Sequence, residues 1–251
     1  MIIAVIGKGG VGKTTITALL LRRLLDSGQT PLLAVDADPS SCLGPALGIT
    51  VNATLAELRE SMRHGSGRPA SQSASEWFAL RMQESVVENP GFDLLTMGRP
   101  EGKGCYCFVN NLIRDHLDRL SRGYRHVLLD CEAGLEHLSR RTSGRLDLMV
   151  CVANRSRMAA ETVRRSLAVY SEVQGTLPPR IDLMLNGFSH GEPLATGTAA
   201  AARGENAPFG RVFVIPTDPE VAELESAGKS LLDLHPASPA AAALRGWELA
   251  A

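Results

Sequence analysis

The stretch Gly7-Lys8-Gly9-Gly10-Val11-Gly12-Lys13-Thr14 decides the fold. It fits the pattern G-x-x-x-x-G-K-[ST] and lies between an apolar, strand-like run and a segment of helical period. In such a loop the glycines let backbone amides turn inward around phosphates, and the N-terminus of the following helix adds a positive dipole. Lys13 is expected to neutralise the β- and γ-phosphates, and the Thr14 hydroxyl to bind Mg²⁺. The predicted nucleotide-binding residues of this loop are Gly9, Gly10, Val11, Gly12, Lys13, Thr14 and Thr15.

The rest of the chain alternates short β-branched runs with longer helical segments, which is typical of a parallel sheet covered on both faces. We therefore predict an α/β fold of the P-loop NTPase type, with a mostly parallel central sheet and helices on both faces. The predicted strands are Ile2–Ile6, Leu32–Asp36, Asp93–Met97, His126–Asp130, Leu148–Ala153, Ile181–Asn186 and Val212–Ile215. The predicted helices are Lys13–Ser27, Asn110–Arg122, Met158–Gln174, Glu220–Ala227 and Pro239–Ala250.

Two stretches interrupt this alternation. Arg63–Ser75 is rich in Ser, Gly and Pro, and Ser189–Pro208 is rich in Gly and Ala, so both are expected to be irregular surface excursions. Neither has the linker-like flanks that would separate two cores. The sequence therefore predicts a single P-loop ATPase domain over residues 1–251.

Composition and charge narrow the classes of function. The chain carries 26 basic and 27 acidic residues, a net charge of −1, which disfavours binding to nucleic acid through bulk charge. No apolar run approaches the ~20 residues that a membrane span requires, and the first residues lack the basic region of a signal peptide. Five cysteines are too few for a disulfide scaffold and favour a reducing compartment. We expect a cytoplasmic protein that binds neither nucleic acid nor membrane.

Lys8 is an unusual residue within the glycine-rich loop. Because Lys13 already serves the phosphates of its own chain, Lys8 is expected to be a free cation at the mouth of the site. The run KGGVGKTT resembles the deviant P-loop ATPases, a class that includes the nitrogenase iron protein, MinD and ParA. In that class this lysine reaches across a dimer to the partner's nucleotide. The resemblance thus implies a homodimer that forms on ATP binding, with Lys8 and Lys13 both catalytic.

Three carboxylates follow predicted strands. Leu128–Asp130 is an apolar strand that ends in an acid, as expected of a Walker B Asp that holds Mg²⁺ through water. The resemblance implies that Asp38 orients the attacking water, as a further catalytic residue, and that Asp36 lies close to the magnesium shell. A simpler alternative is that both acids cap the loop that follows them. The same match implies adenine contacts from Asn186, Pro216 and Asp218.

Cys105 and Cys107 follow a glycine-rich segment and precede a predicted helix. In extended backbone, residues two positions apart face the same side, and a helix N-terminus beside Lys103 should favour the thiolates that metals need. A disulfide would need their Cα atoms closer than extended backbone allows. Two thiolates fill half of a four-coordinate site, so a second copy of the chain would supply the other half. The alternative is an ordinary pair of packed or surface thiols.

The remaining cysteines and three of the histidines receive no metal role. Cys42, Cys131 and Cys151 fall in or beside predicted strands, where a free cysteine usually behaves as a small hydrophobic residue. A lone histidine is more often structural or solvated than a ligand. The histidines left unassigned on this ground are His116, His126 and His137.

A second resemblance, to the CooC-type ATPases, rests on the runs RPEGKGCYC, LLDCEAGLEHLSRRT, VANRSRMAAETVRR and IPTDPEVAE. These ATPases are nickel-insertion maturation factors of carbon monoxide dehydrogenase. The resemblance implies Ni²⁺, or Zn²⁺, held between subunits by Cys105 and Cys107 and delivered to the apo-enzyme, with Glu132–His137 transmitting the nucleotide state. Two departures from this family are Ser40-Ser41-Cys42, where Asn-rich sequence is expected, and Cys131, where Asn is more usual.

Two alternative functions belong to the wider class. An electron donor like the nitrogenase iron protein would hold a [4Fe–4S] cluster between subunits, but its second ligand falls where this chain has Ala133. A positioning ATPase of the MinD or ParA type would need a basic amphipathic tail or a basic DNA-binding surface. The segment Ala240–Trp247 contains one cation, so the sequence favours the metal-delivery reading.

Overall fold

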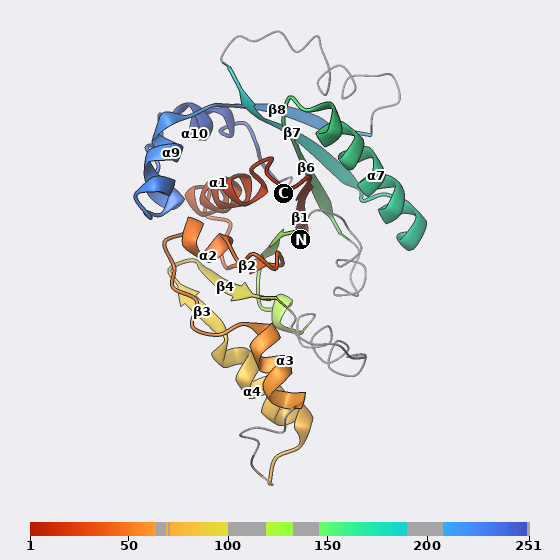
Figure 1. Ribbon diagram of the computed structural model, residues 1–251, viewed down its shortest axis with the longest axis vertical. Coiled ribbons are helices and arrows are strands. Elements are labelled where there is room, and N and C mark those ends of the chain that lie inside the picture. The colour runs from red at the N-terminus through yellow and green to blue at the C-terminus, as the bar shows by residue number, and fades with distance from the viewer. Residues whose placement is uncertain (64–68, 70, 100–118, 133–145, 190–207, 250–251) are drawn as a thin grey trace.

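A computed structural model describes residues 1–63, 69, 71–99, 119–132, 146–189 and 208–249 (Figure 1). Within these residues, eight strands form one sheet in the order β3-β4-β2-β5-β1-β6-β7-β8. The strands are β1 (Ile2–Gly7), β2 (Leu32–Asp36), β3 (Val86–Asn89), β4 (Phe92–Thr96), β5 (His126–Asp130), β6 (Leu148–Ala153), β7 (Arg180–Phe188) and β8 (Arg211–Pro216). The helices are α1 (Lys13–Asp26), α2 (Leu43–Ala46), α3 (Leu55–Arg63), α4 (Ala74–Glu84), α7 (Arg157–Gln174), α9 (Pro219–Ser226), the 3₁₀ helix η1 (Leu231–Asp233) and α10 (Pro239–Ala243).

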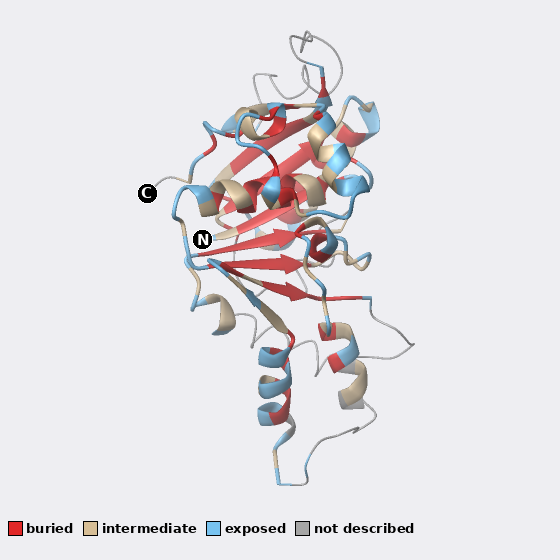
Figure 2. Cartoon of the chain, turned by 90° about the vertical axis from the view of Figure 1, so that its left-hand side faces the viewer, coloured by how far each residue is buried: buried red, intermediate tan, exposed pale blue. Residues whose placement is uncertain are grey.

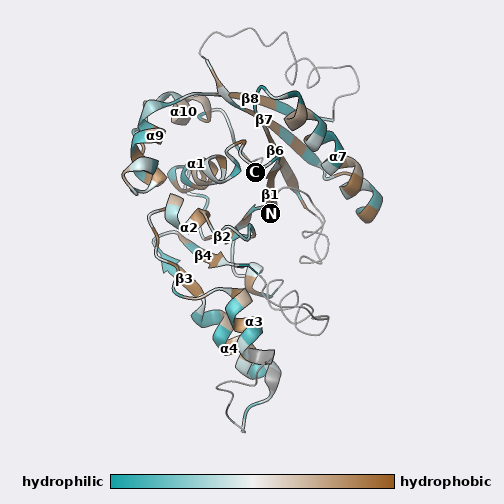
Figure 3. Ribbon diagram, in the orientation of Figure 1, coloured by the Kyte–Doolittle hydropathy of each residue, from teal (hydrophilic) through white to brown (hydrophobic). Residues whose placement is uncertain are grey.

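The predicted fold class is confirmed. All strand pairs are parallel except β3 with β4 at one edge. Every residue of β2, β5 and β6 is buried, so these strands are red in Figure 2, and β6 and β7 are largely brown in Figure 3. Continuous apolar strands are what a parallel sheet needs when helices cover both faces. Here α1 contacts β1 and β5 on one side, and α7 contacts β1 and β6 on the other (Figure 1).

The sheet brings several strand ends to one edge. β1 ends at Gly7 and α1 begins at Lys13, so the glycine-rich loop lies at the carboxyl edge, between the ends of β5 and β6. In the register of the sheet, Asp36 pairs with Asp130 on one neighbour and with Thr96 on the other. Paired residues of adjacent strands point to the same face. The two carboxylates therefore lie side by side next to the loop.

Predicted elements on described residues end within about two residues of the observed ones, with one exception at the C-terminus. The helix predicted over Pro239–Ala250 stops at Ala243. The reason is non-local: Trp247 is buried, and its indole N–H donates to Asp182 Oδ2 at 3.0 Å, in the interior of the sheet. Arg180 pairs with the same carboxylate and donates to the carbonyl of Glu248 at 2.8 Å. These contacts fix the segment in a non-helical path.

Five elements of the described residues were not predicted: β3, α2, α3, α4 and the 3₁₀ helix η1. The predicted end of the irregular segment Arg63–Ser75 is wrong, because α4 begins at Ala74. The Ser73 hydroxyl accepts a hydrogen bond from the Glu76 N–H, and the Glu76 carboxylate accepts one from the Ser73 N–H, which is a capping box. The spacing Ser-x-x-Glu was present in the sequence, and the buried Trp77 and Phe78 follow it directly.

Two predicted segments lie mostly outside the described residues: the helix Asn110–Arg122 and the excursion Ser189–Pro208. Among the helices that the structure does describe, none combines the length and apolar character that a membrane crossing requires.

Candidate nucleotide site

The glycine-rich loop adopts a shape that specific glycines make possible. A Cβ on Gly7 would lie 2.3 Å from the carbonyl oxygen of Val152 on the neighbouring strand. Gly12 has φ +89°, and a Cβ there would lie 2.3 Å from Asn186 Nδ2. That amide instead donates to the carbonyl of Val11 at 2.9 Å. The loop is therefore closed against β6 and β7 by contacts that tolerate only glycine.

The two lysines of the loop lie in different environments. Lys13 is buried, with 7% of its surface exposed, and its Nζ donates to the carbonyl of Lys8 at 3.4 Å. Lys8 itself is exposed. The Lys13 ammonium group thus points into the loop, whereas Lys8 is exposed at its surface.

Asp130 is held by the first two turns of α1. Thr14 Oγ1 donates to Asp130 Oδ2 at 2.7 Å, and Thr17 Oγ1 donates to Asp130 Oδ1 at 3.3 Å. Thr17 is completely buried and also donates to the carbonyl of Lys13 at 2.9 Å. Sequence reasoning missed Thr17. Its signal was a second hydroxyl three residues after Thr14, on the same helix face.

Asp36 and Asp38 both hydrogen-bond the loop that follows them. Asp36 Oδ2 accepts from the Leu43 N–H at 2.8 Å, and Asp36 Oδ1 accepts from the Asp38 N–H at 3.2 Å. Asp38 Oδ1 accepts from the Ser40 N–H at 2.9 Å, and Ser41 has φ +50°. This geometry is that of the simpler alternative, in which both acids shape the loop. Asp38 is half-exposed, whereas Asp36 is fully buried.

Burial changes the acidity of the paired carboxyls. It raises the pKa of Asp36 from 3.8 to about 7, against the hydrogen bond from Leu43, and the neighbouring Asp130 raises it further. Burial likewise raises the pKa of Asp130 to about 6, although Thr14 and Lys13 oppose the change. A folded pKa above the unfolded value means that the folded state binds more protons. The free energy of unfolding of the metal-free protein therefore falls as pH rises from about 4 to about 7.

The donor set fits a magnesium ion. Mg²⁺ takes oxygen ligands, is usually held by one or two carboxylates with substrate phosphates, and keeps several waters. Thr14, Asp36 and Asp130 offer such oxygens, and a cation would compensate the charge that burial disfavours. No cluster of three or more His, Cys, Asp or Glu side chains able to hold a metal by themselves occurs in the part of the chain that the structure describes.

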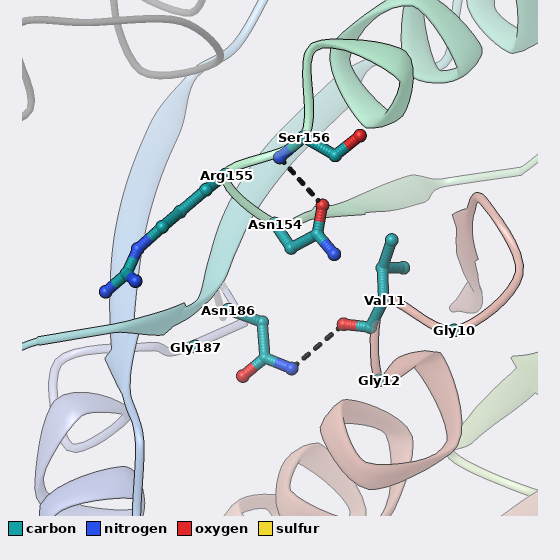
Figure 4. Close-up of a pocket in the computed structure, with 8 residues that line it drawn as sticks. All are labelled: Gly10, Val11, Gly12, Asn154, Arg155, Ser156, Asn186 and Gly187. Atoms are coloured by element: carbon teal, nitrogen blue, oxygen red, sulfur yellow. Dashed lines mark hydrogen bonds between the residues drawn. The ribbon is translucent and has the colours of Figure 1, made fainter.

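A pocket of about 380 Å³ opens beside the loop (Figure 4). Asn186 and Gly187 of β7 form one wall, where the pairing with β8 shifts register between Asn186 and Phe188. Such a β-bulge re-aims side chains, and here the Asn186 amide points at Val11. The residues between β6 and α7 form the other wall and were not predicted to belong to the site: Asn154, Arg155 and Ser156.

The remaining predicted adenine residues lie at the end of β8. Pro216 is its last residue, and Asp218 is the N-cap of α9. The Asp218 carboxylate accepts from the Glu220 N–H at 3.0 Å and from the Ala240 N–H at 2.9 Å, so it joins two helix starts. Thr15, the last loop residue predicted to bind nucleotide, donates its hydroxyl to Glu225 Oε1 of α9 at 2.9 Å. The structure thus links α9 directly to the first turn of α1, which follows the loop.

The predicted metal ligands Cys105 and Cys107 lie outside the described residues, as do Ala133 and positions 134–137. Of the other cysteines, Cys131 and Cys151 are buried as expected, and burial raises the pKa of both thiols, which disfavours the thiolate form. Cys42 differs from the expectation because it is exposed, at the end of the loop that Asp36 and Asp38 shape.

Comparisons with known proteins show the family and the fold of this chain. The family model of the CobQ/CobB/MinD/ParA nucleotide binding domain matches residues 2–232. An uncharacterized ATP-binding protein of Methanocaldococcus jannaschii, MJ0685, is 43% identical over 177 residues, or 69% of this chain and 70% of that protein. The carbon monoxide dehydrogenase accessory protein CooC of Rhodospirillum rubrum is 34% identical over 254 residues, covering 94% of this chain and 91% of CooC. A ParA family ATPase from Chlorobium tepidum superposes with a TM-score of 0.70 at 20% identity, over 98% of this chain and 97% of that one, a likeness of fold.

Substituting Gly12→Ala is expected to weaken ADP binding by about tenfold or more, because the new methyl group would displace the Asn186 amide and strain a positive φ. Isothermal titration calorimetry measures the affinity. Gly28→Ala is the matched control, since Gly28 has φ +66° but no atom near its Cβ position. Equal affinities in the Gly12→Ala variant and the wild type would contradict the role of this contact.

Binding of Mg²⁺·ADP at pH 6.5 is expected to release about one proton, because the cation requires Asp36 and Asp130 as anions and their pKa values are about 7 and about 6. The release should vanish near pH 8.5. Calorimetry in two buffers of different ionisation enthalpy counts the protons. Asp36→Asn should release fewer, whereas Asp233→Asn, at an exposed carboxylate, should match the wild type. Identical release in all three proteins would show that Asp36 is not involved.

Proposed function

Because this chain belongs to the CobQ/CobB/MinD/ParA nucleotide-binding family and is an ATPase, we propose that it uses ATP to deliver a metal ion during the maturation of carbon monoxide dehydrogenase. In this proposal residues 1–251 form one ATPase domain that dimerises on ATP binding. The cargo is Ni²⁺, or Zn²⁺, held between two copies by Cys105 and Cys107. The observation that carries the proposal is the 34% identity to CooC over 94% of this chain, together with the Cys-x-Cys segment.

The geometry of the loop supports nucleotide binding within one copy. The amides of the glycine-rich loop and the buried Lys13 would hold the phosphates, and Thr14, Asp36 and Asp130 would hold Mg²⁺. The magnesium ion, when bound, would neutralise charge that develops on the transferred phosphoryl group. Asn186 and Pro216 border the region in which adenine is proposed to lie, with Asp218 behind them as the cap of α9.

Hydrolysis would depend on two residues at the open side of the site. Asp38 is half-exposed and would hold the attacking water in line with the γ-phosphate. Its Oδ1 already accepts the Ser40 N–H, which fixes the direction of the carboxylate. Lys8 is exposed, so its ammonium group is available to a phosphate of the partner's nucleotide. The homodimer would thereby become the hydrolytic form.

The metal site is proposed on chemical grounds. Cys131 and Cys151 are buried with raised pKa values, so they are poor sources of thiolate, whereas a Cys-x-Cys in a reducing cytoplasm would stay available for metal. Two copies would provide four sulfur ligands, which suit Ni²⁺ and Zn²⁺. Release to the apo-enzyme would follow when hydrolysis loosens the dimer.

Replacing Cys105 and Cys107 together with Ala is expected to abolish binding of one Ni²⁺ per two chains, because each copy would lose its half of the ligand set. ATP binding should stay unchanged. Equilibrium dialysis with elemental analysis measures the metal, and Cys42→Ala, which removes an exposed thiol elsewhere, is the matched control. Full Ni²⁺ stoichiometry in the double variant would refute the assignment, and about four irons per dimer after anaerobic purification would favour an iron–sulfur protein instead.

Lys8→Ala is expected to prevent ATP-dependent dimerisation while leaving the affinity of the monomer for ADP within about twofold of the wild type. The reason is that Lys8 is exposed, while Lys13 faces the loop. Light scattering with a non-hydrolysable ATP analogue measures the mass. The control is Lys229→Ala, at an exposed lysine after α9. A Lys8→Ala protein that still dimerises with the analogue would contradict the proposed contact.

A further inference from the structure

Thr96 ends β4 in the same row as the two buried carboxylates. Asp36 is paired in register with Asp130 on one side and with Thr96 on the other. Because paired residues share a face, Thr96 faces the side on which α1 and α2 lie. Leu94, two residues earlier on the same face, confirms this, since a Cβ on Gly44 of α2 would lie 3.6 Å from Leu94 Cδ2.

The three side chains of this row differ in their hydrogen bonds. Asp130 accepts from two threonines of α1, and Asp36 accepts from two backbone N–H groups. The Thr96 hydroxyl is almost completely buried, with 1% of the residue exposed, and it has no partner within the described part of the chain. A buried hydroxyl without a partner is less favourable than the methyl group of an isosteric valine.

The backbone around Thr96 is fixed from two directions. The next residue, Met97, donates its N–H to the carbonyl of Asp36 at 2.8 Å and accepts from the Ala56 N–H at 2.9 Å. Gly98 packs so closely on Thr54 that a Cβ there would lie 2.7 Å from that side chain. The Thr96 hydroxyl is therefore held beside Asp36 by contacts that do not involve the hydroxyl itself.

We propose that Thr96 is a positioning residue of the magnesium site, whose hydroxyl hydrogen-bonds a water molecule carried by Mg²⁺ beside Asp36. The inference rests on the proposed nucleotide site and extends it to a residue outside the loop motifs. Mg²⁺ keeps several of its waters when it binds, and a hydroxyl can both donate to a carboxylate and accept from such a water. Groups in this outer position orient the inner ligands, and their loss commonly costs tenfold or more in metal affinity.

The test compares Thr96→Val, which keeps the shape and removes the hydroxyl, with Thr96→Ser, which keeps the hydroxyl. Thermal unfolding of each protein without nucleotide or metal gives its stability, and calorimetric titration of ADP with increasing Mg²⁺ gives the apparent Mg²⁺ affinity. We expect Thr96→Val to unfold at the wild-type temperature or above it and to bind ADP normally in EDTA. Its apparent Mg²⁺ affinity should fall about tenfold, while that of Thr96→Ser stays within about twofold of the wild type.

Two results would overturn the inference. A wild-type Mg²⁺ affinity in Thr96→Val would show that the hydroxyl does not act on the ion. A lower unfolding temperature in metal-free Thr96→Val, restored in Thr96→Ser, would assign the hydroxyl a structural role. If wild-type protein itself gave no response to Mg²⁺, the proposed nucleotide site would fail together with this inference, whereas the two results above concern Thr96 alone.

Discussion

Two carboxyl groups placed side by side in a nearly dry interior are the constraint around which this structure is built. Asp36 and Asp130 are adjacent because β2 and β5 are neighbours in the sheet, and less than about one-fiftieth of either residue is exposed. Each carboxylate accepts hydrogen bonds from the N-terminal end of a helix. Asp130 accepts from threonine hydroxyls of α1, and Asp36 accepts from the first N–H of α2. Hydrogen bonds lower the cost of burying these groups, but they do not cancel the mutual repulsion of two anions. A divalent cation would cancel it, and this is the charge that Mg²⁺ would bring to the site proposed at these two carboxylates.

The sequence predicts the parts of this site that arise locally. The glycine-rich loop, the apolar strands and the acids at their ends are encoded in contiguous residues, and their positions were predicted to within about two residues. The sequence alone does not predict the neighbours of these acids that depend on strand order and register. Thr17 reaches Asp130 because α1 lies over β5, and Thr96 lies beside Asp36 because β4 pairs with β2, an order that no single segment encodes. The predicted length of the C-terminal helix was wrong for the same reason, because the helix ends early and Trp247 hydrogen-bonds Asp182, which is distant in the sequence.

Asn186 shows how one side chain can serve both the shape of the loop and recognition. Its amide nitrogen donates to Val11 and occupies the space that makes Gly12 obligatory, while its carbonyl oxygen points away from that contact (Figure 4). The exocyclic amine of adenine is a donor from which such an oxygen would accept a hydrogen bond. Asn186 is the last residue of β7 in regular register with β8, and the register shifts at Gly187, which has φ +78°. Loop closure and the proposed adenine contact therefore depend on the same side chain.

The order of the strands also explains how nucleotide and metal could be coupled in the proposed function. The two carboxylates lie at the ends of β2 and β5. Backbone hydrogen bonds connect the ends of neighbouring strands there: the Met97 N–H donates to the carbonyl of Asp36, and the Ala37 N–H donates to the carbonyl of Asp130. Cys105 follows Thr96 by nine residues, and Glu132 follows Asp130 by two. The chain after Thr96, which leads toward Cys105, and the chain after Asp130, which leads to Glu132, thus begin at the same edge of the sheet as the proposed magnesium ligands. Packed interiors switch between discrete arrangements and do not deform continuously. In the proposed function, a change in charge at Asp36 and Asp130 would therefore act on the chain after Thr96 and on the chain after Asp130 together. The proposed coupling therefore requires no contact between the bound metal and the nucleotide.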